Sequence, residues 1–430
     1  MTDEKKPLLR SEKKLKSAAL VQAYQKEWWN QTQERLRQGE PYAICMADDA
    51  EDIFTAFDIP VIVIPWWSAM ISAKRMSEYY GNVLAAHGYD MDQYGSLGLG
   101  VTLDHRPEIA PWGGLPKPLV IMGTTMSDHA LKITDLWARE YGCTCFTTEL
   151  NYNTPTNPYP HRWWEKIRDH WDQVIEPHKI DLKVQELKGL IRFLEVHTGK
   201  EFSHAKLTEV MNLVNEQEDL WAKTRDLIAQ SSPCVVTLPD QLSMYPAQWH
   251  RGKPQGRDII KAFYEETLER VHTGQVACPR EKIRMMWLGV GLWVNTAFFQ
   301  YFEEEYGVTF VASIYTSIAA DGYARTIKNN DPLRALASRF AWLGVQETEW
   351  LAHVAKQHHC DGVVGFQCGP RPQLWTRYLE KQGLPVCEIP GNNVDARQWD
   401  DVNIRNLMKD FIEKRILPNK KQAGRLKTDD

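Results

Sequence analysis

The stretch PLVIMGTTMSDHALKITDLWAREYGCTCFTTE, residues 118–149, decides the fold. Its apolar start predicts a strand over 118–122, and the amphipathic pattern over 127–141 predicts a helix that Gly142 ends. A second strand is expected over 143–149. A strand, a helix and a second strand in this order form a parallel βαβ unit, which is typical of a doubly wound sheet with helices on both faces.

The same alternation continues on both sides of this unit. Strands are expected at 42–47, 61–64, 283–288, 308–313, 362–366 and 385–389, and helices at 51–57, 68–87, 295–306, 332–340, 346–359, 372–382 and 400–415. Residues 161–231 are helical in pattern almost throughout. We therefore expect an α/β protein made of two doubly wound flavodoxin-like lobes with an intervening helical region. The expected divisions are an N-terminal helical segment (1–40), a first lobe (41–160), a helical region and linker (161–280) and a second lobe (281–430).

Composition and charge exclude several classes of protein. The 430 residues contain 51 Lys and Arg against 56 Asp and Glu, a net charge of −5, so no cation excess is available for coating nucleic acid. The apolar runs have the length of strands, and the N-terminus is charged without an apolar leader. A cytoplasmic location is therefore expected, with no partner nucleic acid or membrane. The chain also lacks a P-loop motif.

Ligands of doubly wound sheets bind beyond the carboxyl ends of the strands, so the turns at 65–68, 123–128, 289–295, 313–317 and 367–370 are candidates. Thr124, Thr125, Ser127 and Asp128 stand where a strand ends and a helix begins. Hydroxyls and free amides there suit an anion, a carbonyl or a phosphate. Ser127 or Asp128 could equally be a helix cap without a ligand. Ser68 is a similar cap candidate.

Seventeen tryptophans are an unusual number, and several stand at expected turns or strand ends. Trp66, Trp67 and Trp293 could form the walls of a flat apolar substrate pocket. Ordinary packing between the lobes explains them equally well.

The eight cysteines show no C-x-x-C spacing, and a disulfide framework is not expected in a cytoplasmic chain. Cys143 and Cys145 alternate along an expected strand and are interpreted as small buried side chains. Cys368 differs, because it lies between a strand end and a helix start, where a helix dipole would favour a thiolate ligand. A buried inert thiol is the alternative there.

With these motifs in order, the chain resembles the 2-hydroxyacyl-CoA dehydratase subunits and the related ATP-dependent benzoyl-CoA reductase subunits, over about residues 50–415. The resemblance rests on seven short motifs with a characteristic order and spacing. They are FDIPV at 57–61, LPKP at 115–118, DLWAREYGC at 135–143, VASIYT at 311–316, DPLRALA at 331–337, DGVVGFQC at 361–368 and GLP at 383–385.

The resemblance implies a subunit of a heterodimer or larger complex, with two flavodoxin-like lobes around a helical region. Typical members bind a [4Fe-4S] cluster between the lobes through three cysteines on strand-end turns. An ATP-hydrolysing activator supplies an electron to the acyl-CoA thioester, which becomes a ketyl radical and loses water; in the reductases an aromatic ring is reduced.

The sequence departs from this pattern where the cluster would bind. The segments 94–100 (YGSLGLG) and 123–128 (GTTMSD) contain no cysteine, which leaves Cys368 as the one matching thiol. A Pro-Glu pair usual in the family is Pro65-Trp66 here. One thiolate cannot hold a cubane as three can.

We therefore expect the cluster in a homologous partner subunit, with Cys368 the one candidate metal ligand in this chain. The resemblance then assigns an acyl-CoA pocket to Trp66, Trp67, Ser96, Thr124, Thr125, Trp293, Tyr315 and Gln367, and catalytic polar groups to Ser68, Ser127 and Asp128. The alternatives are a non-redox enzyme acting on an aromatic acyl-CoA, and a scaffold subunit without catalysis.

Overall fold

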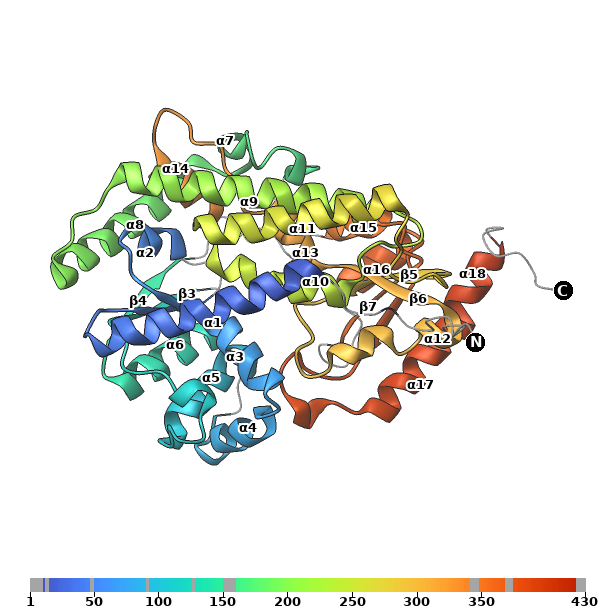
Figure 1. Cartoon of the computed structure of the whole chain (residues 1–430), viewed down its shortest axis with the longest axis horizontal. Helices are drawn as coiled ribbons and strands as arrows, with labels where there is room; N and C mark the ends of the chain where they lie inside the picture. The colour runs from blue at the N-terminus through green and yellow to red at the C-terminus, as the bar shows by residue number, and fades with distance from the viewer. Residues whose placement is uncertain are drawn as a thin grey trace, which may run out of the picture.

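The chain folds into two α/β lobes joined by long helices (Figure 1). The structure, a computed structural model, describes residues 11, 15–46, 50–89, 93–125, 128–149, 160–340, 348–367 and 374–422. Each lobe contains a four-stranded parallel sheet, with strand order β2-β1-β3-β4 in the first and β6-β5-β7-β8 in the second. The two sheets thus repeat one topology, which confirms the expected α/β two-lobe fold.

The first lobe starts from strand β1 (Ala43–Cys45), which pairs with β2 and β3 in parallel register. Both central strands, β1 and β3, are buried along their whole length, as expected for a sheet covered on both faces. Its other elements are α2 (Glu51–Ala56), β2 (Val61–Val63), α3 (Ile64–Ala73), α4 (Ser77–Ala86), α5 (Gln93–Asp104), β3 (Val120–Thr124), α6 (Asp128–Tyr141) and β4 (Thr144–Thr148).

The second lobe is built from strand β5 (Ile283–Leu288) and its neighbours β6 and β7. Its other elements are α12 (Glu303–Tyr306), β6 (Val308–Ser313), α13 (Ile314–Asp321), α14 (Pro332–Phe340), α15 (Thr348–Gln357), β7 (Gly362–Phe366), α16 (Leu374–Lys381), β8 (Val386–Ile389), α17 (Asp401–Phe411), a π turn (Ile412–Ile416) and α18 (Leu417–Gln422).

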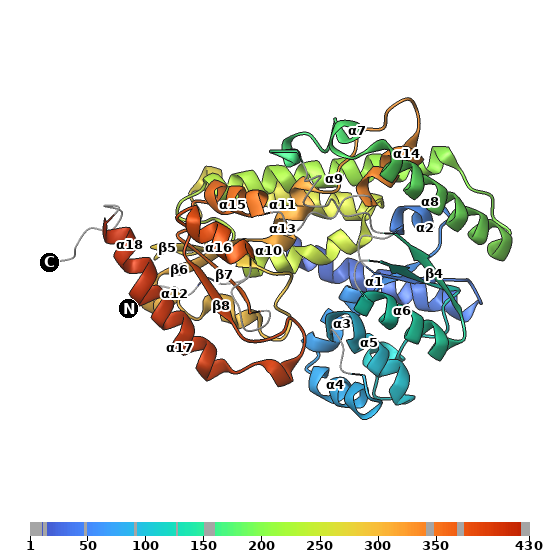
Figure 2. The ribbon, with the colours of Figure 1, turned by 180° about the vertical axis from the view of Figure 1, so that it is seen from behind.

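Long helices connect the lobes. Helix α9 (His204–Gln230) contacts α2 of the first lobe and α13 and α14 of the second, and α11 (Pro254–Thr273) packs along it. Figures 1 and 2 show both helices running past the two sheets, with α1 (Lys16–Arg37) packed on α11. The remaining α-helices are α7 (Trp171–Val174), α8 (Pro177–Thr198) and α10 (Leu238–Met244), and the 3-10 helix η3 (Tyr245–His250) directly follows α10. Among the described helices, none has both the length and the apolar character of a membrane span.

The prediction of one helix over 68–87 was wrong, because α3 and α4 are separate. Arg75 adopts a left-handed conformation (φ 60°), and the Met76 N–H donates to the Ile71 carbonyl over 3.1 Å. This bond closes a Schellman-type helix end, which usually uses glycine. The break turns α4 away from α3 and toward the second lobe, where its contacts position the candidate site.

Three further segments differ from expectation. Residues 65–68 form the first turns of α3 rather than a loop, since Pro65 fits the start of a helix. Residues 94–100, where the family resemblance implies a cysteine-bearing turn, lie inside α5. The helix expected over 295–306 is a 3-10 helix (Thr296–Gln300) followed by the short α12.

Candidate functional site between the lobes

Three aromatic side chains meet where the carboxyl end of the second sheet faces the first lobe. The Trp293 indole N–H donates to the Tyr94 hydroxyl over 3.2 Å, and the Tyr94 and Tyr315 hydroxyls are 3.4 Å apart. Tyr94 belongs to α5 of the first lobe, Trp293 follows β5, and Tyr315 lies in α13 directly after β6. Two residues expected at the site, Trp293 and Tyr315, are therefore brought together.

The 3-10 helix η3 adds a second layer of rings. Tyr315 stacks on Tyr245 with ring centres 3.6 Å apart, and Trp249 lies 5.9 Å from Trp293. We call these five residues the junction cluster: Tyr94, Tyr245, Trp249, Trp293 and Tyr315. Rings from the two lobes and the helical region therefore form one contiguous aromatic cluster that carries phenolic hydroxyls.

A capping box fixes the position of Tyr315. The Ser313 hydroxyl accepts from the Thr316 N–H, and the Ser313 N–H donates to the Thr316 hydroxyl, both over 3.1 Å. The Trp221 indole of α9 also donates to the Thr316 carbonyl over 2.7 Å. These bonds satisfy backbone groups at the helix start and hold the Tyr315 ring in place.

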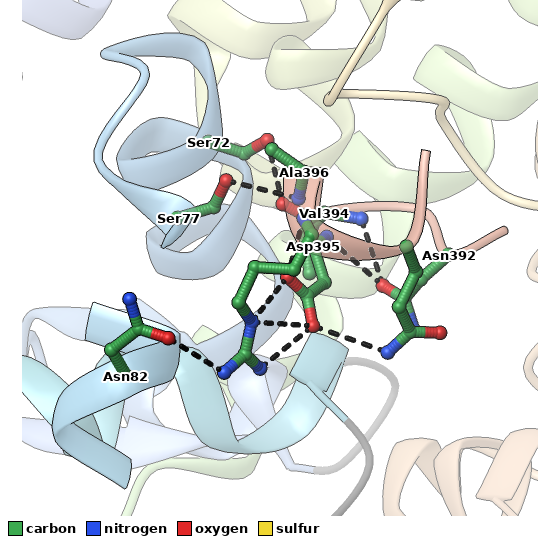
Figure 3. A network of polar contacts seen from close by, with 9 residues as sticks. Ser72, Ser77, Asn82, Asn392, Val394, Asp395 and Ala396 are labelled. Carbon is green, nitrogen blue, oxygen red and sulfur yellow. Dashed lines mark hydrogen bonds and ion pairs between the residues drawn. The ribbon is translucent and has the colours of Figure 1, made fainter. Parts of the chain in front are cut away.

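A loop after β8, residues 392–397, ties the second lobe to the first, and we call it the strap. On its own lobe, the Asn393 carbonyl accepts the N–H groups of Trp293 and Val294 over 2.8 and 3.0 Å. Across the junction, the Ser72 hydroxyl donates to the Val394 carbonyl over 3.1 Å (Figure 3). The strap thus holds the Trp293 turn at a set distance from α3.

The charged part of the strap is a buried carboxylate. Asp395, whose side chain is 1% exposed, accepts the Arg397 Nε–H over 2.9 Å and the Arg397 Nη2–H over 2.8 Å (Figure 3). Burial alone would raise the pKa of Asp395, but the Arg397 hydrogen bonds and charge lower it overall. Arg397 in turn donates to Asn82 of α4 over 3.3 Å, and it lies over Gly81, where a Cβ would be 2.6 Å from the guanidinium carbon.

A small polar cavity of about 30 Å³ has Trp249 of the junction cluster in its wall, and it has room for about two water molecules. Asp52 of α2 and Arg339 of α14 pair across it over 2.7 Å, and both side chains are at least 95% buried. Within the described chain, Asp52 Oδ1, Gln248 Nε2 and His250 Nε2 are among the buried atoms of its lining residues that have no hydrogen-bond partner. Burial, with the Lys253 charge, lowers the pKa of His250, so its ring is neutral at pH 7.

Unpaired buried donors and acceptors are costly, and native proteins usually satisfy them with water or ligand. The mixture here, a carboxylate oxygen, an amide N–H and a neutral imidazole, can bind a group that has both a hydroxyl and a carbonyl. The cavity therefore adds hydrogen-bonding capacity to the apolar junction cluster.

The structure places Trp66 and Trp67 in a packed cluster of indoles. Trp66 lies 5.6 Å from Trp28 and 5.3 Å from Trp112, measured between ring centres, and both Trp66 and Trp67 are buried. This arrangement agrees with the alternative that Trp66 and Trp67 serve ordinary packing rather than form pocket walls. Ser68 and Ser96 are also fully buried, in α3 and α5, and within the described chain neither hydroxyl has a hydrogen-bond partner.

The expected residues at the other strand ends lie apart from the junction cluster's hydrogen bonds. Thr124 is buried at the end of β3, and the Thr125 hydroxyl donates to Glu149 over 2.8 Å. Asp128 is exposed at the start of α6, and Gln367 is exposed after β7. Ser127 and Cys368 lie outside the described residues.

The side chains present do not fit a standard [4Fe-4S] cluster. Two of the three expected cysteine positions hold other residues, and the described part of the chain contains no group of three His, Cys, Asp or Glu side chains that could hold a metal ion. Among other thiols, burial raises the pKa of Cys143 to about 11 and that of Cys234 to about 12, which disfavours the thiolate that iron requires.

Sequence reasoning missed the polar cavity entirely. Asp52 and Arg339 are 287 residues apart, so no local pattern links them. Gln248, Trp249 and His250 fall in a segment interpreted only as a linker between the halves. The dense aromatic and polar run YPAQWHR at 245–251 was the one available signal.

Comparisons with known proteins agree with this architecture. The family model of the 2-hydroxyglutaryl-CoA dehydratase D-component matches residues 50–414. The chain is 21% identical over 402 residues to the (R)-2-hydroxyisocaproyl-CoA dehydratase alpha subunit of Clostridioides difficile, covering 90% of this chain and 93% of that one. It is 21% identical over 405 residues to the (R)-phenyllactyl-CoA dehydratase alpha subunit of Clostridium sporogenes, covering 91% and 93%. The (R)-2-hydroxyglutaryl-CoA dehydratase alpha subunit of Acidaminococcus fermentans matches at 21% over 256 residues, 57% of this chain and 52% of that one.

Proposed function

Because the chain belongs to the 2-hydroxyglutaryl-CoA dehydratase D-component family, we propose that it is one subunit of a heteromeric enzyme that dehydrates a 2-hydroxyacyl-CoA. The observation that carries the proposal is the match over residues 50–414, which spans both lobes and the junction between them. In the overall reaction the bond from C2 to the hydroxyl oxygen breaks, a proton leaves C3, and an enoyl-CoA and water are the products.

We assign this chain the substrate pocket. The acyl chain would lie against the junction cluster, with Trp293 and Tyr315 as its side walls. Its 2-hydroxyl would donate to Asp52 Oδ1, and its thioester carbonyl would accept from Gln248 Nε2, since these two atoms have no other partner in the described chain. The pocket roles of Trp66, Trp67, Ser96, Thr124, Thr125 and Gln367, the catalytic roles of Ser68, Ser127 and Asp128, and metal binding by Cys368 stay predictions.

The missing thiols support a division of labour between subunits. A homologous partner would carry the [4Fe-4S] cluster, and an ATP-hydrolysing activator would supply the electron that makes loss of the hydroxyl feasible. An aromatic acyl group, with ring reduction as in benzoyl-CoA reductases, would use the same pocket.

Co-expression with a cysteine-complete homologue tests this proposal. We expect the chain alone to contain less than one iron atom per monomer, and the co-purified complex to be brown and to dehydrate 2-hydroxyacyl-CoA with activator, ATP and reductant. Stoichiometric cluster iron on the isolated chain would overturn the cluster-free assignment.

The same lack of thiols favours one alternative, a non-redox enzyme acting on an aromatic acyl-CoA. Turnover without ATP, activator or reductant would support this alternative, and a strict requirement for all three would exclude it. If no acyl-CoA raises the melting temperature of the complex, the scaffold function is correct instead, because a ligand that binds the folded state must stabilise it.

A further inference from the structure

A cleft of about 880 Å³ opens at the amino ends of the second sheet, and we call it the amino-edge cleft. Its walls come from the start of β5, the turn after α15 and helix α18. These elements lie on one side of the sheet in Figure 2. The junction cluster follows the carboxyl ends of the same strands. Strand β5 has six residues, so the two sites are separated by roughly 17 Å at about 3.3 Å per residue.

The cleft has a cation excess in a chain whose net charge is −5. Four cationic side chains line it (Lys282, Arg284, Lys356 and Lys420) against two acidic ones (Glu281 and Asp361), an excess of 4 − 2 = 2. Both acids are engaged within the protein. Glu281 pairs with Arg284 over 3.1 Å, and Asp361 pairs with Lys420 over 2.6 Å.

The two remaining lysines are available to a ligand. Lys356 donates to the neutral Gln382 over 3.0 Å, and Lys282 is exposed at the start of β5. They come from different elements of the wall, Lys282 from the residue before β5 and Lys356 from α15, so an anion between them would contact two chain segments.

The floor of the cleft contains a buried guanidinium with an unused donor. Arg284 is 5% exposed, and its Nη atoms donate to the carbonyls of Ser231 and Ile228 over 2.6 and 3.2 Å. Its Nε has no hydrogen-bond partner within the described chain. A buried guanidinium N–H without an acceptor is costly, and Arg284 contributes its charge and this unpaired donor to the wall of the cleft.

We propose that the amino-edge cleft binds a phosphate-bearing small molecule, with a phosphoryl group between Lys282 and Lys356 above Arg284. A phosphate monoester carries about −1.5 to −2 charges at pH 7, which matches the excess of two better than a single carboxylate does. The volume lies within the roughly 300–1,000 Å³ of small-molecule sites, so it can hold more than the phosphate. A nucleotide and the phosphates of a CoA thioester share this chemistry.

Calorimetric titration tests the proposal with inorganic pyrophosphate, ADP and CoA, each added to the purified protein at low salt. The test variant is Lys282→Gln with Lys356→Gln. The matched control is Lys188→Gln with Lys223→Gln, two exposed lysines of α8 and α9 that carry the same charge change away from the cleft. We expect saturable pyrophosphate binding that the test variant weakens by about 10- to 100-fold, as expected for two charge-assisted contacts, and that the control leaves within about twofold.

A preference for ADP over CoA would identify a nucleotide as the source of the phosphate, and the reverse preference would identify a CoA thioester. Absence of saturable binding by all three probes would overturn the proposal. Equal weakening by both variants would overturn it as well, because it would indicate only general electrostatic attraction. Binding that neither variant weakens would also overturn the proposal. The assay does not depend on dehydratase activity, so it can fail while the proposed function holds.

Discussion

The two lobes share one strand order, but the segments at the ends of their strands have different roles. In the first lobe the segment after β2 turns into α3 and buries Trp66 and Trp67 among other indoles. In the second lobe the segments after β5 and β6 present Trp293 and Tyr315 to the junction, and the amino ends open into a basic cleft. The topology determines where a site can form, and the side chains at each strand end determine whether one does.

The largest effect is expected at the ion pair that joins the lobes. Asp52→Ala would leave the Arg339 guanidinium buried without this partner, and should lower the free energy of unfolding by about 3–5 kcal/mol, measured by urea denaturation. The control replaces both partners, Asp52→Leu with Arg339→Met, and should recover most of that loss. A loss below about 1 kcal/mol for Asp52→Ala would show that the lobes do not depend on this pair.

The strap gives the next effect. Asp395→Asn removes charge-assisted hydrogen bonds and should destabilise the protein by about 1–3 kcal/mol at pH 7. Because the folded pKa of Asp395 is lowered, its contribution is complete above the unfolded pKa of about 4 and is lost as pH falls through the folded value. The difference between wild type and variant should therefore shrink below about pH 4 in urea midpoints measured from pH 3 to 7. A constant difference would contradict this assignment.

Two helical glycines sharpen the comparison further. Gly81→Ala of α4 places a Cβ 2.6 Å from the Arg397 guanidinium carbon, whereas Gly189→Ala of α8 meets its nearest atom at 3.5 Å. Alanine should stabilise α8 by about 0.5–1 kcal/mol. At Gly81 the displaced Arg397 should cancel that gain, leaving the variant about 1 kcal/mol or more below the Gly189 variant. Equal melting temperatures for the two variants would show that Arg397 of the strap moves aside without a cost in stability.

The smallest effect concerns the hydrogen bond across the junction. Trp293→Phe and Tyr94→Phe each remove one partner of the 3.2 Å bond, and each should cost about 0.5–1.5 kcal/mol. A double-mutant cycle should give a coupling of similar size, and KM for the acyl-CoA should rise more than kcat falls. Additive effects would mean that the two residues act independently.

The sequence predicted the sheets because buried parallel strands appear as short apolar runs between amphipathic helices. It also predicted that Trp293 and Tyr315 follow strand ends, and in the structure both side chains contact Tyr94; their role in a substrate pocket stays a prediction. It did not reveal the break at Arg75, because a left-handed residue other than glycine has no local signature. The positions of Trp66 and Trp67 depend on Trp28, Trp29 and Trp112, and the polar cavity depends on segments from three parts of the chain. Such contacts become visible only in the folded protein.

Helix α1 lies before the segment that matches the family, yet its Trp28 and Trp29 cover Trp66 and Trp112. A gene fragment beginning at residue 41 would keep β1 and every family motif and would still leave these indoles facing water. Such a fragment should aggregate or require detergent, and anyone trimming the protein for crystallisation should retain residues 16–37.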